Sequence, residues 1–281
     1  MREPSASFPS PEIVLARARG ENFTVASALL GRATARHLRA IYGYARLVDE
    51  LGDSAEGDRL LLLDELEAEI DRAFSGHPRH ALMQELAEAI RASGLPRGPF
   101  LRLLEANRRD QAQPEYESYS DLLSYCKLSA NPVGELVLHV FGVATDERIA
   151  LSDDVCSALQ LIEHWQDVGE DAARGRIYLP EEDRAAFGVV RDDLSAERTC
   201  EPLRRLLAFE SERAARLLDS GSKLVSSLRG RARLAVAGYV GGGRAALHAL
   251  AACDYDVLAV RARASGPRRA WLSLVSLKGG S

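Results

Sequence analysis

Helix-forming residues dominate this chain. Leu, Ala, Arg and Glu are abundant, whereas β-branched residues are sparse outside short runs. The sequence contains no series of alternating strand segments separated by Asn-Gly or Asp-Gly turns, and it contains no internal repeat. The pattern therefore predicts an all-α fold, a helical bundle with an apolar interior in a single domain over residues 1–281.

Apolar periodicity, glycine and proline together mark where the helices begin and end. Ser152 is expected to cap a helix that reaches Asp171, and Pro180 is expected to lie in a loop. The expected helices are 24–51, 57–74, 79–92, 100–110, 118–130, 132–141, 152–171, 201–228 and 231–253.

Charge and cysteine content narrow the classes of function. The chain carries 36 basic and 41 acidic side chains, a formal net charge of −5, so it lacks the basic excess that drives nucleic-acid binding. Its cysteines are far apart and form no C-x-x-C pair, which argues against a zinc cluster or a disulfide framework. Free thiols fit a reducing cytoplasm. The cysteines are Cys126, Cys156, Cys200 and Cys253.

The two ends of the chain bear on its location. The N-terminal MREPSASFPSPE has no apolar stretch typical of a signal peptide, and no segment approaches the ~18–20 apolar residues that span a bilayer. We expect a cytoplasmic protein with an ordered core over 20–263 and tails at 1–19 and 264–281. The second tail is basic and then apolar around Trp271 and Val275. We expect it to be mobile or to pack on its own domain, with peripheral contact to an anionic membrane or to a partner as the alternative.

The first chemical signal lies in AIYGYARLVDELGD (40–53). On a helix, Tyr42, Arg46, Asp49 and Asp53 fall at i, i+4, i+7 and i+11 and form one stripe. Asp49 and Asp53 are one turn apart, roughly 5–6 Å, so their carboxylates repel unless a cation or a proton lies between them. Mg²⁺ suits this pair because it accepts carboxylate oxygen and keeps water and phosphate in its other positions. Arg46 would bind a phosphate or pair with Asp49, and the alternative for the whole stripe is a solvated acidic helix end.

The second signal lies in QLIEHWQDVGEDAARGRIYLP (160–180). Three carboxylates at i, i+3 and i+4 share one face, with two more polar residues further up that face and two arginines just beyond the expected helix end. These residues are Asp167, Glu170 and Asp171, then Gln160 and Glu163, then Arg174 and Arg176. Taken alone, this segment is also compatible with solvated surface.

Two acidic helix faces are more informative than one. If the two helices face each other, their carboxylates would hold two or three Mg²⁺ ions, which would bind a diphosphate that the carboxylates alone repel. Such ions can neutralise a leaving diphosphate, whose departure leaves an allylic or cyclopropylcarbinyl cation. An apolar interior below the carboxylates would suit an isoprenoid chain.

These motifs resemble the squalene/phytoene synthase family over about residues 20 to 263. The segments that carry the resemblance are ENFTVAS (21–27), YGYARLVDELGD (42–53), YCKLSANPVGELVLHVFG (125–142), WQDVGEDAARGRIYLP (165–180) and CDYDVL (253–258). ENFTVAS and SANPVG are most similar to the bacterial hopanoid-associated branch of the family, which includes hydroxysqualene synthase.

The resemblance implies a terpenoid synthase fold with a central apolar cavity. It further implies Mg²⁺-dependent conversion of presqualene diphosphate to hydroxysqualene, with water capturing the carbocation and without NADPH, alongside other hopanoid-pathway enzymes. One alternative is condensation of two farnesyl diphosphates to presqualene diphosphate, squalene or a carotenoid precursor. Another is a catalytically silent homologue that acts as a scaffold.

The resemblance also implies roles for individual residues. The family pattern makes Asp49, Asp53, Asp167, Glu170 and Asp171 the Mg²⁺ ligands. It makes Arg46, Gln160, Arg174 and Arg176 the diphosphate contacts, and it places Tyr42, Tyr125, Tyr178, Phe23, Val133 and Gly134 at the reaction cavity. Aromatic ring faces there could stabilise passing carbocations. Each of these aromatic residues has the alternative role of ordinary core packing.

Three departures from the family pattern concern the same motifs. Glu50 and Glu163 stand where the family more often has Asp and Asn, and the family's V-A-G-x-V-G is replaced by the six residues 129–134. Ser129 and Asn131 bring hydrogen-bonding groups into this helix break, so we hypothesise that one of them positions the water or the diphosphate. The alternative is that they satisfy backbone groups freed by Pro132.

The remaining histidines and glycines suggest no further chemistry. The six histidines form no H-E-x-x-H or triad grouping, and His139 and His164 are expected to pack between helices or lie at the surface. The glycines at 241–243 do not match G-x-G-x-x-G and follow no strand, so they do not indicate a dinucleotide site.

Overall fold

The computed structural model describes residues 8, 30–112, 115–260, 262, 273 and 275–277. Every regular element within these residues is helical, and the one extended pairing among them is a single bridge between Glu115 and Ile177. The prediction of an all-α fold is confirmed. The chain forms two compact units, the first from residues up to Ala112 together with Glu135–Ala144, the second from Gln113–Gly134 and the residues after Ala144.

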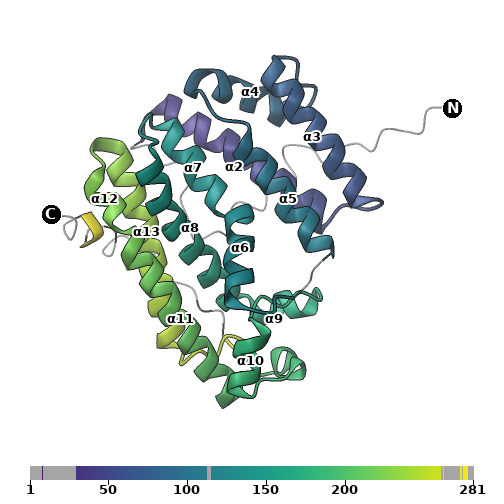
Figure 1. Ribbon diagram of the computed structural model, residues 1–281, viewed down its shortest axis with the longest axis vertical. Helices are drawn as coiled ribbons and strands as arrows, with labels where there is room; N and C mark the ends of the chain where they lie inside the picture. The colour runs from purple at the N-terminus through teal and green to yellow at the C-terminus, as the bar shows by residue number, and fades with distance from the viewer. Residues whose placement is uncertain are drawn as a thin grey trace. The chain divides into compact units, whose positions relative to one another are not determined.

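The first unit is built around its longest helix. It contains α2 (Arg32–Asp53), α3 (Arg59–Ser75), α4 (Ala81–Ser93), α5 (Gly98–Ala112) and most of α7 (Asn131–Val140). Helix α2 packs against α3, α4 and α5, and α3 also contacts α4 and α5 (Figure 1). Tyr44 is fully buried in this core, where its hydroxyl donates to the carbonyl of Phe100 at 2.9 Å and the two rings meet edge to face.

Two helices of this unit end at glycines. Helix α3 begins after Asp58, whose side chain accepts a hydrogen bond from the Leu61 N–H at 3.1 Å. Helices α3 and α4 end at Gly76 and Gly94, which have positive φ angles of 87° and 60° that favour glycine. The predicted ends of these helices, at 74 and 92, are therefore correct to within one residue.

The second unit is organised around α8. It contains α6 (Tyr119–Ser129), α8 (Asp146–Gln166), α9 (Val168–Ala173), α10 (Glu181–Phe187), the 3₁₀ helix η3 (Arg191–Ser195), α11 (Glu201–Gly221), α12 (Lys223–Ser227) and α13 (Gly230–Ala252). Helix α8 runs beside α11, and both contact α13 (Figure 1).

Glycines allow close helix contacts in this unit. A Cβ at Gly221 would lie 2.7 Å from the Leu151 carbonyl oxygen and 2.8 Å from the Val155 nitrogen, so α11 meets the backbone of α8 there. A Cβ at Gly243 would lie 2.7 Å from Cδ2 of Leu159. The glycines at 241–243 therefore serve helix packing within the buried face of α13.

Replacing Gly221 with Ala is expected to lower the free energy of unfolding by about 1–3 kcal/mol, because the new methyl overlaps backbone atoms that cannot rotate away. The matched control is Gly238→Ala on α13, where nothing lies within 4 Å of the added Cβ. The free energy of unfolding of that control should be unchanged or rise by up to about 1 kcal/mol, because Ala has a higher helix propensity than Gly. Urea unfolding of both variants measures the difference, and equal stabilities would contradict the close contact.

The predicted helix 152–171 is wrong at both of its ends. Helix α8 is capped by Thr145, whose hydroxyl accepts from the Arg148 N–H at 3.3 Å, and Ser152 is buried in mid-helix. The helix ends at Gln166 rather than Asp171, because Asp167 has φ −108° and ψ 15° and interrupts it before α9.

Other predicted boundaries also need correction. The expected helix 201–228 is two helices, broken at Ser222, and the expected loop after Pro180 contains α10 and η3. Helix α4 begins at Ala81 rather than 79, because the N–H groups of Arg79 and His80 donate to the buried Glu69 carboxylate. Helix α2 begins at Arg32 rather than 24, and residues 24–29 lie outside the described residues.

The described part of the C-terminal tail lies on α13. Arg244 donates to the Ser276 hydroxyl at 3.1 Å, and Arg233 donates to the Leu277 carbonyl at 2.7 Å. Packing of the tail on its own chain is confirmed for these residues, whereas Trp271 lies outside the described ones.

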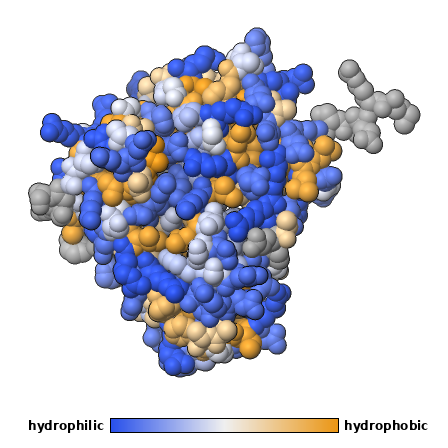
Figure 2. Space-filling view, viewed as in Figure 1, coloured by the Kyte–Doolittle hydropathy of each residue, from blue (hydrophilic) through white to orange (hydrophobic). Residues whose placement is uncertain are grey.

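Within the described part of the chain, no helix combines the length and the apolar character that a membrane span requires. Hydrophilic residues cover most of the face in Figure 2, with smaller groups of hydrophobic residues between them. Membrane contact by the tail stays a prediction.

Candidate active site

The first acidic stripe lies on the last turns of α2. Ile41 and Val48 are buried on one side of the helix, which leaves Arg46 and Asp49 partly exposed on the other. Nη1 of Arg46 lies 3.4 Å from Oδ2 of Asp49, so the predicted pairing of these residues is present. Asp53 ends the helix and is exposed.

Helix α5 fixes this end of α2. A Cβ at Gly52 would overlap the side chain of Asn107, so only glycine lets the two helices approach this closely. Gln111 donates from Nε2 to the Gly52 carbonyl at 2.9 Å. The backbone next to Asp53 is therefore held by α5.

The second acidic segment forms a single helical turn, residues 167–171, which we call the acidic turn. The Asp171 N–H donates to the Asp167 carbonyl at 2.9 Å, so the predicted i, i+4 relation holds although the helix is interrupted. Asp167 and Asp171 are half-buried and Glu170 is exposed. The Arg176 N–H donates to the Asp171 carbonyl at 2.9 Å, and Arg174, at the end of α9, is exposed.

The segment after α13 contacts the residue before the acidic turn and a residue within it. Gln166 donates from Nε2 to the Ala262 carbonyl, and a Cβ at Gly169 would lie 2.8 Å from Cδ2 of Leu258. The CDYDVL motif (253–258) therefore packs against the helical turn that carries the carboxylates.

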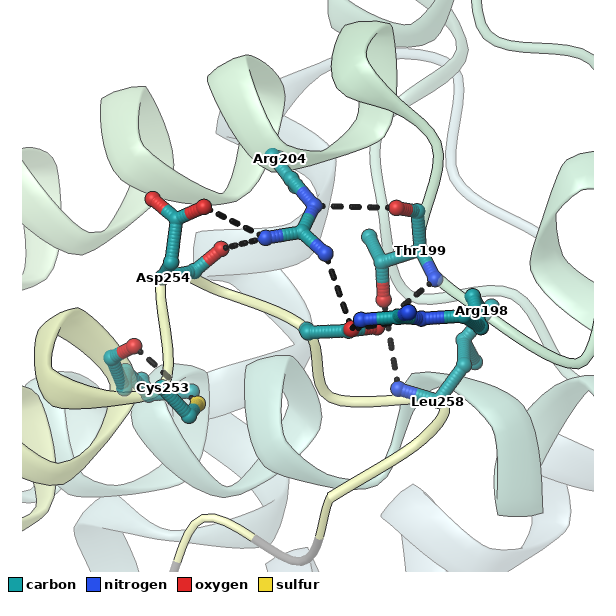
Figure 3. Close-up of polar contacts among 8 residues, drawn as sticks. Arg198, Thr199, Arg204, Cys253, Asp254 and Leu258 are labelled. Atoms are coloured by element: carbon teal, nitrogen blue, oxygen red, sulfur yellow. Dashed lines mark hydrogen bonds and ion pairs between the residues drawn. The ribbon is translucent and has the colours of Figure 1, made fainter.

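Ionic contacts anchor the CDYDVL motif. Asp256 is buried, and its carboxylate accepts from Arg198 at 2.8 Å and from the Thr199 N–H at 2.9 Å, with Arg204 also 2.8 Å away. These hydrogen bonds, that of Arg198 first, lower the pKa of Asp256 to about 2. Arg204 also donates to the Asp254 carbonyl at 2.8 Å (Figure 3). The motif is thereby tied to the start of α11.

A cluster of aromatic rings lies in the same unit as the acidic turn. The rings of His164 and Tyr178 stack with centroids 3.6 Å apart, and Tyr116 stacks on Tyr178 at 5.7 Å. Tyr125 lies 5.6 Å from Tyr178. All four residues are buried, and the cluster brings together Tyr125 and Tyr178, two of the aromatic residues expected at the reaction cavity. Tyr42 belongs to the first unit, and Phe23 lies outside the described residues.

His164 connects this cluster to the acidic turn. Its Nε2 lies 3.0 Å from Nε2 of Gln160, and its Nδ1 lies 3.6 Å from Oδ2 of Asp171. Sequence reasoning placed His164 among packing or surface residues and did not single out Tyr116. The signal for His164 was its spacing, since Gln160, His164, Asp167 and Asp171 repeat the i, i+4, i+7, i+11 stripe of the first motif.

The break between α6 and α7 holds the two polar residues that depart from the family pattern. With its amide nitrogen facing acceptors, Asn131 donates to the Cys126 carbonyl at 3.3 Å and to the Ser157 hydroxyl at 2.9 Å. These contacts fit the alternative that Asn131 satisfies the backbone at the break. The Ser129 hydroxyl is buried and has no hydrogen-bond partner among the described residues. A Cβ at Gly134, which like Ser152 belongs to the second unit, would overlap the Ser152 side chain, so the chain at Gly134 packs tightly on α8.

The carboxylates fit the way Mg²⁺ binds proteins. Among the residues that the structure describes, no three His, Cys, Asp or Glu side chains lie close enough together to hold a metal ion. Mg²⁺ commonly uses only one or two carboxylates and takes water and substrate phosphate as its other ligands. Carboxylates one turn apart, as on α2 and in the acidic turn, supply such a set.

Comparison with known proteins agrees with these motifs. The family model for squalene/phytoene synthase matches residues 16–269. A hydroxysqualene synthase of Sinorhizobium fredii is 34% identical over 215 residues, which are 75% of this chain and 72% of that protein. The chloroplastic phytoene synthase 2 of Solanum lycopersicum is 28% identical over 257 residues, 89% of this chain and 83% of that protein.

A solved structure extends the likeness to the fold. The squalene synthase HpnC from Alicyclobacillus acidocaldarius superposes with a TM-score of 0.80 at 42% identity, covering 88% of this chain and 94% of that one. Because the family match spans the α2 stripe, the acidic turn and the CDYDVL motif, we conclude that this chain belongs to the squalene/phytoene synthase family.

Proposed function

We propose that this protein is a Mg²⁺-dependent enzyme that converts presqualene diphosphate to hydroxysqualene and releases diphosphate. The observation that carries the proposal is the acidic turn beside the aromatic cluster, joined by the contact between His164 and Asp171. A group that binds an anion through a metal and a group of ring faces that favour a cation are the two requirements for ionising an isoprenoid diphosphate. The hydroxysqualene synthase and HpnC relatives favour the hopanoid-type reaction within the family.

In this proposal the carboxylates hold the metal and the arginines hold the diphosphate. Asp49 and Asp53, and Asp167 and Asp171 with Glu170, would ligate Mg²⁺, which supplies Lewis-acid neutralisation of the leaving diphosphate. Arg46, Arg174 and Arg176 would contact phosphate oxygens, since guanidinium groups match them in shape and charge.

The residues around the acidic turn serve the steps that follow. The carbon–oxygen bond to the diphosphate breaks, and the diphosphate leaves with the electron pair. Tyr125 would offer a ring face to the resulting cyclopropylcarbinyl cation without reacting with it, with Tyr178 beside it, although His164 already stacks on Tyr178. The cation would rearrange, and a water oxygen would bond to it as a carbon–carbon bond of the cyclopropane breaks. The oxygen then loses one proton to the released diphosphate or to solvent, which yields the open-chain alcohol without a reductant.

Ser129 is our candidate for holding that water. Its hydroxyl is buried, lacks a partner among the described residues, and lies one helical turn beyond Tyr125 on α6. We expect Ser129→Ala to lower the ratio of alcohol to hydrocarbon product about tenfold, the effect of one lost hydrogen bond. Ser124→Ala, which removes an exposed hydroxyl from the same helix, is the control. A product ratio unchanged by Ser129→Ala would refute this role.

The proposed reaction is tested by incubating the enzyme with Mg²⁺ and either presqualene or farnesyl diphosphate, with and without NADPH. We expect hydroxysqualene from presqualene diphosphate without NADPH, and no turnover when Mg²⁺ is chelated. Turnover of farnesyl diphosphate alone would reject the proposal. It would favour head-to-head condensation, the second candidate, which the likeness to phytoene synthase supports.

A further inference from the structure

We propose that His164 is a positioning residue, which orients the Asp171 carboxylate toward the Mg²⁺–diphosphate complex. The proposal rests on the proposed function for the identity of that complex. His164 contacts three residues expected at the site from different directions, namely Gln160 along α8, Asp171 in the acidic turn and Tyr178 beyond it.

The polar contacts of His164 define one tautomer. The amide nitrogen of Gln160 is a donor, so Nε2 of His164 accepts from it at 3.0 Å. In the neutral ring the proton then resides on Nδ1, which faces Oδ2 of Asp171 at 3.6 Å. Gln160 thus sets which edge of the imidazole presents an N–H to the carboxylate.

Stacking fixes the plane of the His164 ring. The centroid of the Tyr178 ring lies 3.6 Å away at an interplanar angle of 15°, and that of the Tyr125 ring lies 6.3 Å away at an angle of 40°. His164 is 7% exposed, so the ring is enclosed by these neighbours. An imidazole held by one hydrogen bond and one stacked ring can direct Nδ1 toward only one place.

This arrangement acts on Asp171 as residues behind a metal ligand commonly act. A ligating carboxylate keeps its direction through a hydrogen-bonding partner behind it, and loss of that partner typically weakens metal binding about 10–100-fold. Asp171 is partly buried, with 16% of its side chain exposed, and Nδ1 of His164 lies 3.6 Å from its Oδ2, slightly longer than a hydrogen bond, so a small movement on metal binding would close the contact. In the first motif, Arg46 takes the equivalent position in the stripe and contacts Asp49.

The test compares substitutions that keep different parts of the imidazole. His164→Phe keeps a ring for stacking and removes both nitrogens, His164→Asn keeps a donor near Nδ1, and His164→Gln places its amide near Nε2. Titration calorimetry with Mg²⁺ and inorganic pyrophosphate measures binding without turnover. His248→Asn, an exposed histidine on α13, is the control.

We expect His164→Phe and His164→Gln to weaken binding of Mg²⁺–pyrophosphate about 10–100-fold, with melting temperatures close to wild type. His164→Asn should stay within about threefold of wild type, a rescue that a purely structural role would not give. If His164→Phe does not fold, the difference between the Asn and Gln variants decides the matter.

Wild-type affinity in both His164→Phe and His164→Gln would overturn the positioning role while leaving the proposed function intact. Equal weakening in the Asn and Gln variants would also overturn it. Failure of the wild-type protein to bind Mg²⁺–pyrophosphate would overturn both the positioning role and the proposed function.

Discussion

Asp171→Asn is expected to reduce turnover of the isoprenoid diphosphate by roughly 10²–10⁴-fold at fixed Mg²⁺. The amide keeps the size of the carboxylate but removes the charge that would hold the metal, and several kcal/mol of transition-state stabilisation correspond to this range of rates. Steady-state kinetics over a range of Mg²⁺ concentrations measure the loss. Asp192→Asn, which changes an exposed carboxylate in η3, should retain wild-type kinetics.

Asp49→Asn in the first unit provides the companion measurement. A loss of similar size is expected from the proposed ligation of Mg²⁺ by Asp49 and Asp53, because the amide again removes a metal-binding charge. Wild-type turnover in either variant across the whole range of Mg²⁺ concentrations, limiting and saturating, would contradict the assignment of that carboxylate as a metal ligand.

Glu210→Gln is expected to remove the loss of stability that Glu210 causes as pH rises from about 5 to 8. Glu210 is fully buried on α11, where Arg213 lies 3.1 Å from its Oε1 and also pairs with Asp183 at 2.6 Å. One arginine thus serves two buried carboxylates. Burial, followed by the hydrogen bond with Asp183, raises the pKa of Glu210 from 4.5 to about 8.

The direction of the pH dependence follows from the linkage between proton binding at Glu210 and folding. The folded protein binds the Glu210 proton more tightly than the unfolded chain, so the stabilisation is complete below about pH 4.5 and is lost as pH rises toward about 8. Glutamine carries no such proton, so at pH 9 the free energy of unfolding of the variant should exceed that of the wild type by on the order of 5 kcal/mol.

Urea unfolding at pH 5 and pH 9 tests this expectation. Glu212→Gln, an exposed change on the same helix, should follow wild type at both values. A wild-type protein equally stable at pH 5 and 9, or a Glu210→Gln variant with the wild-type slope, would rule out a raised pKa at Glu210.

Local pattern was sufficient for the presence of most helices and for the two carboxylate stripes, but not for several of the helix ends. Spacing alone placed Asp49 with Asp53 and Asp167 with Asp171, because residues one turn apart share a helix face wherever the helix packs. The start of α8 was predicted wrongly because the sequence offers two possible N-cap residues. Ser152 followed by two aspartates resembles an N-cap, but Thr145 precedes it and starts the helix earlier.

Contacts between segments that lie far apart in the chain could not be predicted from the local sequence pattern. The pairing of Asp256 with Arg198 and Arg204 joins residues more than fifty positions apart and depends on how α13 returns to α11. The stacking of His164 on Tyr178 likewise requires the chain to reverse after α9, at Gly175 with φ 79°. In neither case does the sequence around one residue indicate which distant residue it contacts.

The interleaving of the two units along the chain has a consequence for biosynthesis. The first unit is completed by Glu135–Ala144, which follows a stretch of the second unit, and Glu135 pairs there with Arg102 while Leu136 and Leu138 are buried. Nascent domains generally fold in the order in which they emerge from the ribosome. Here the unit that carries Asp49 and Asp53 cannot close its core until residue 144 has emerged, so translation must pass well into the second unit first. A chain released at residue 134 would contain the first acidic motif whole and still lack part of the core of its unit.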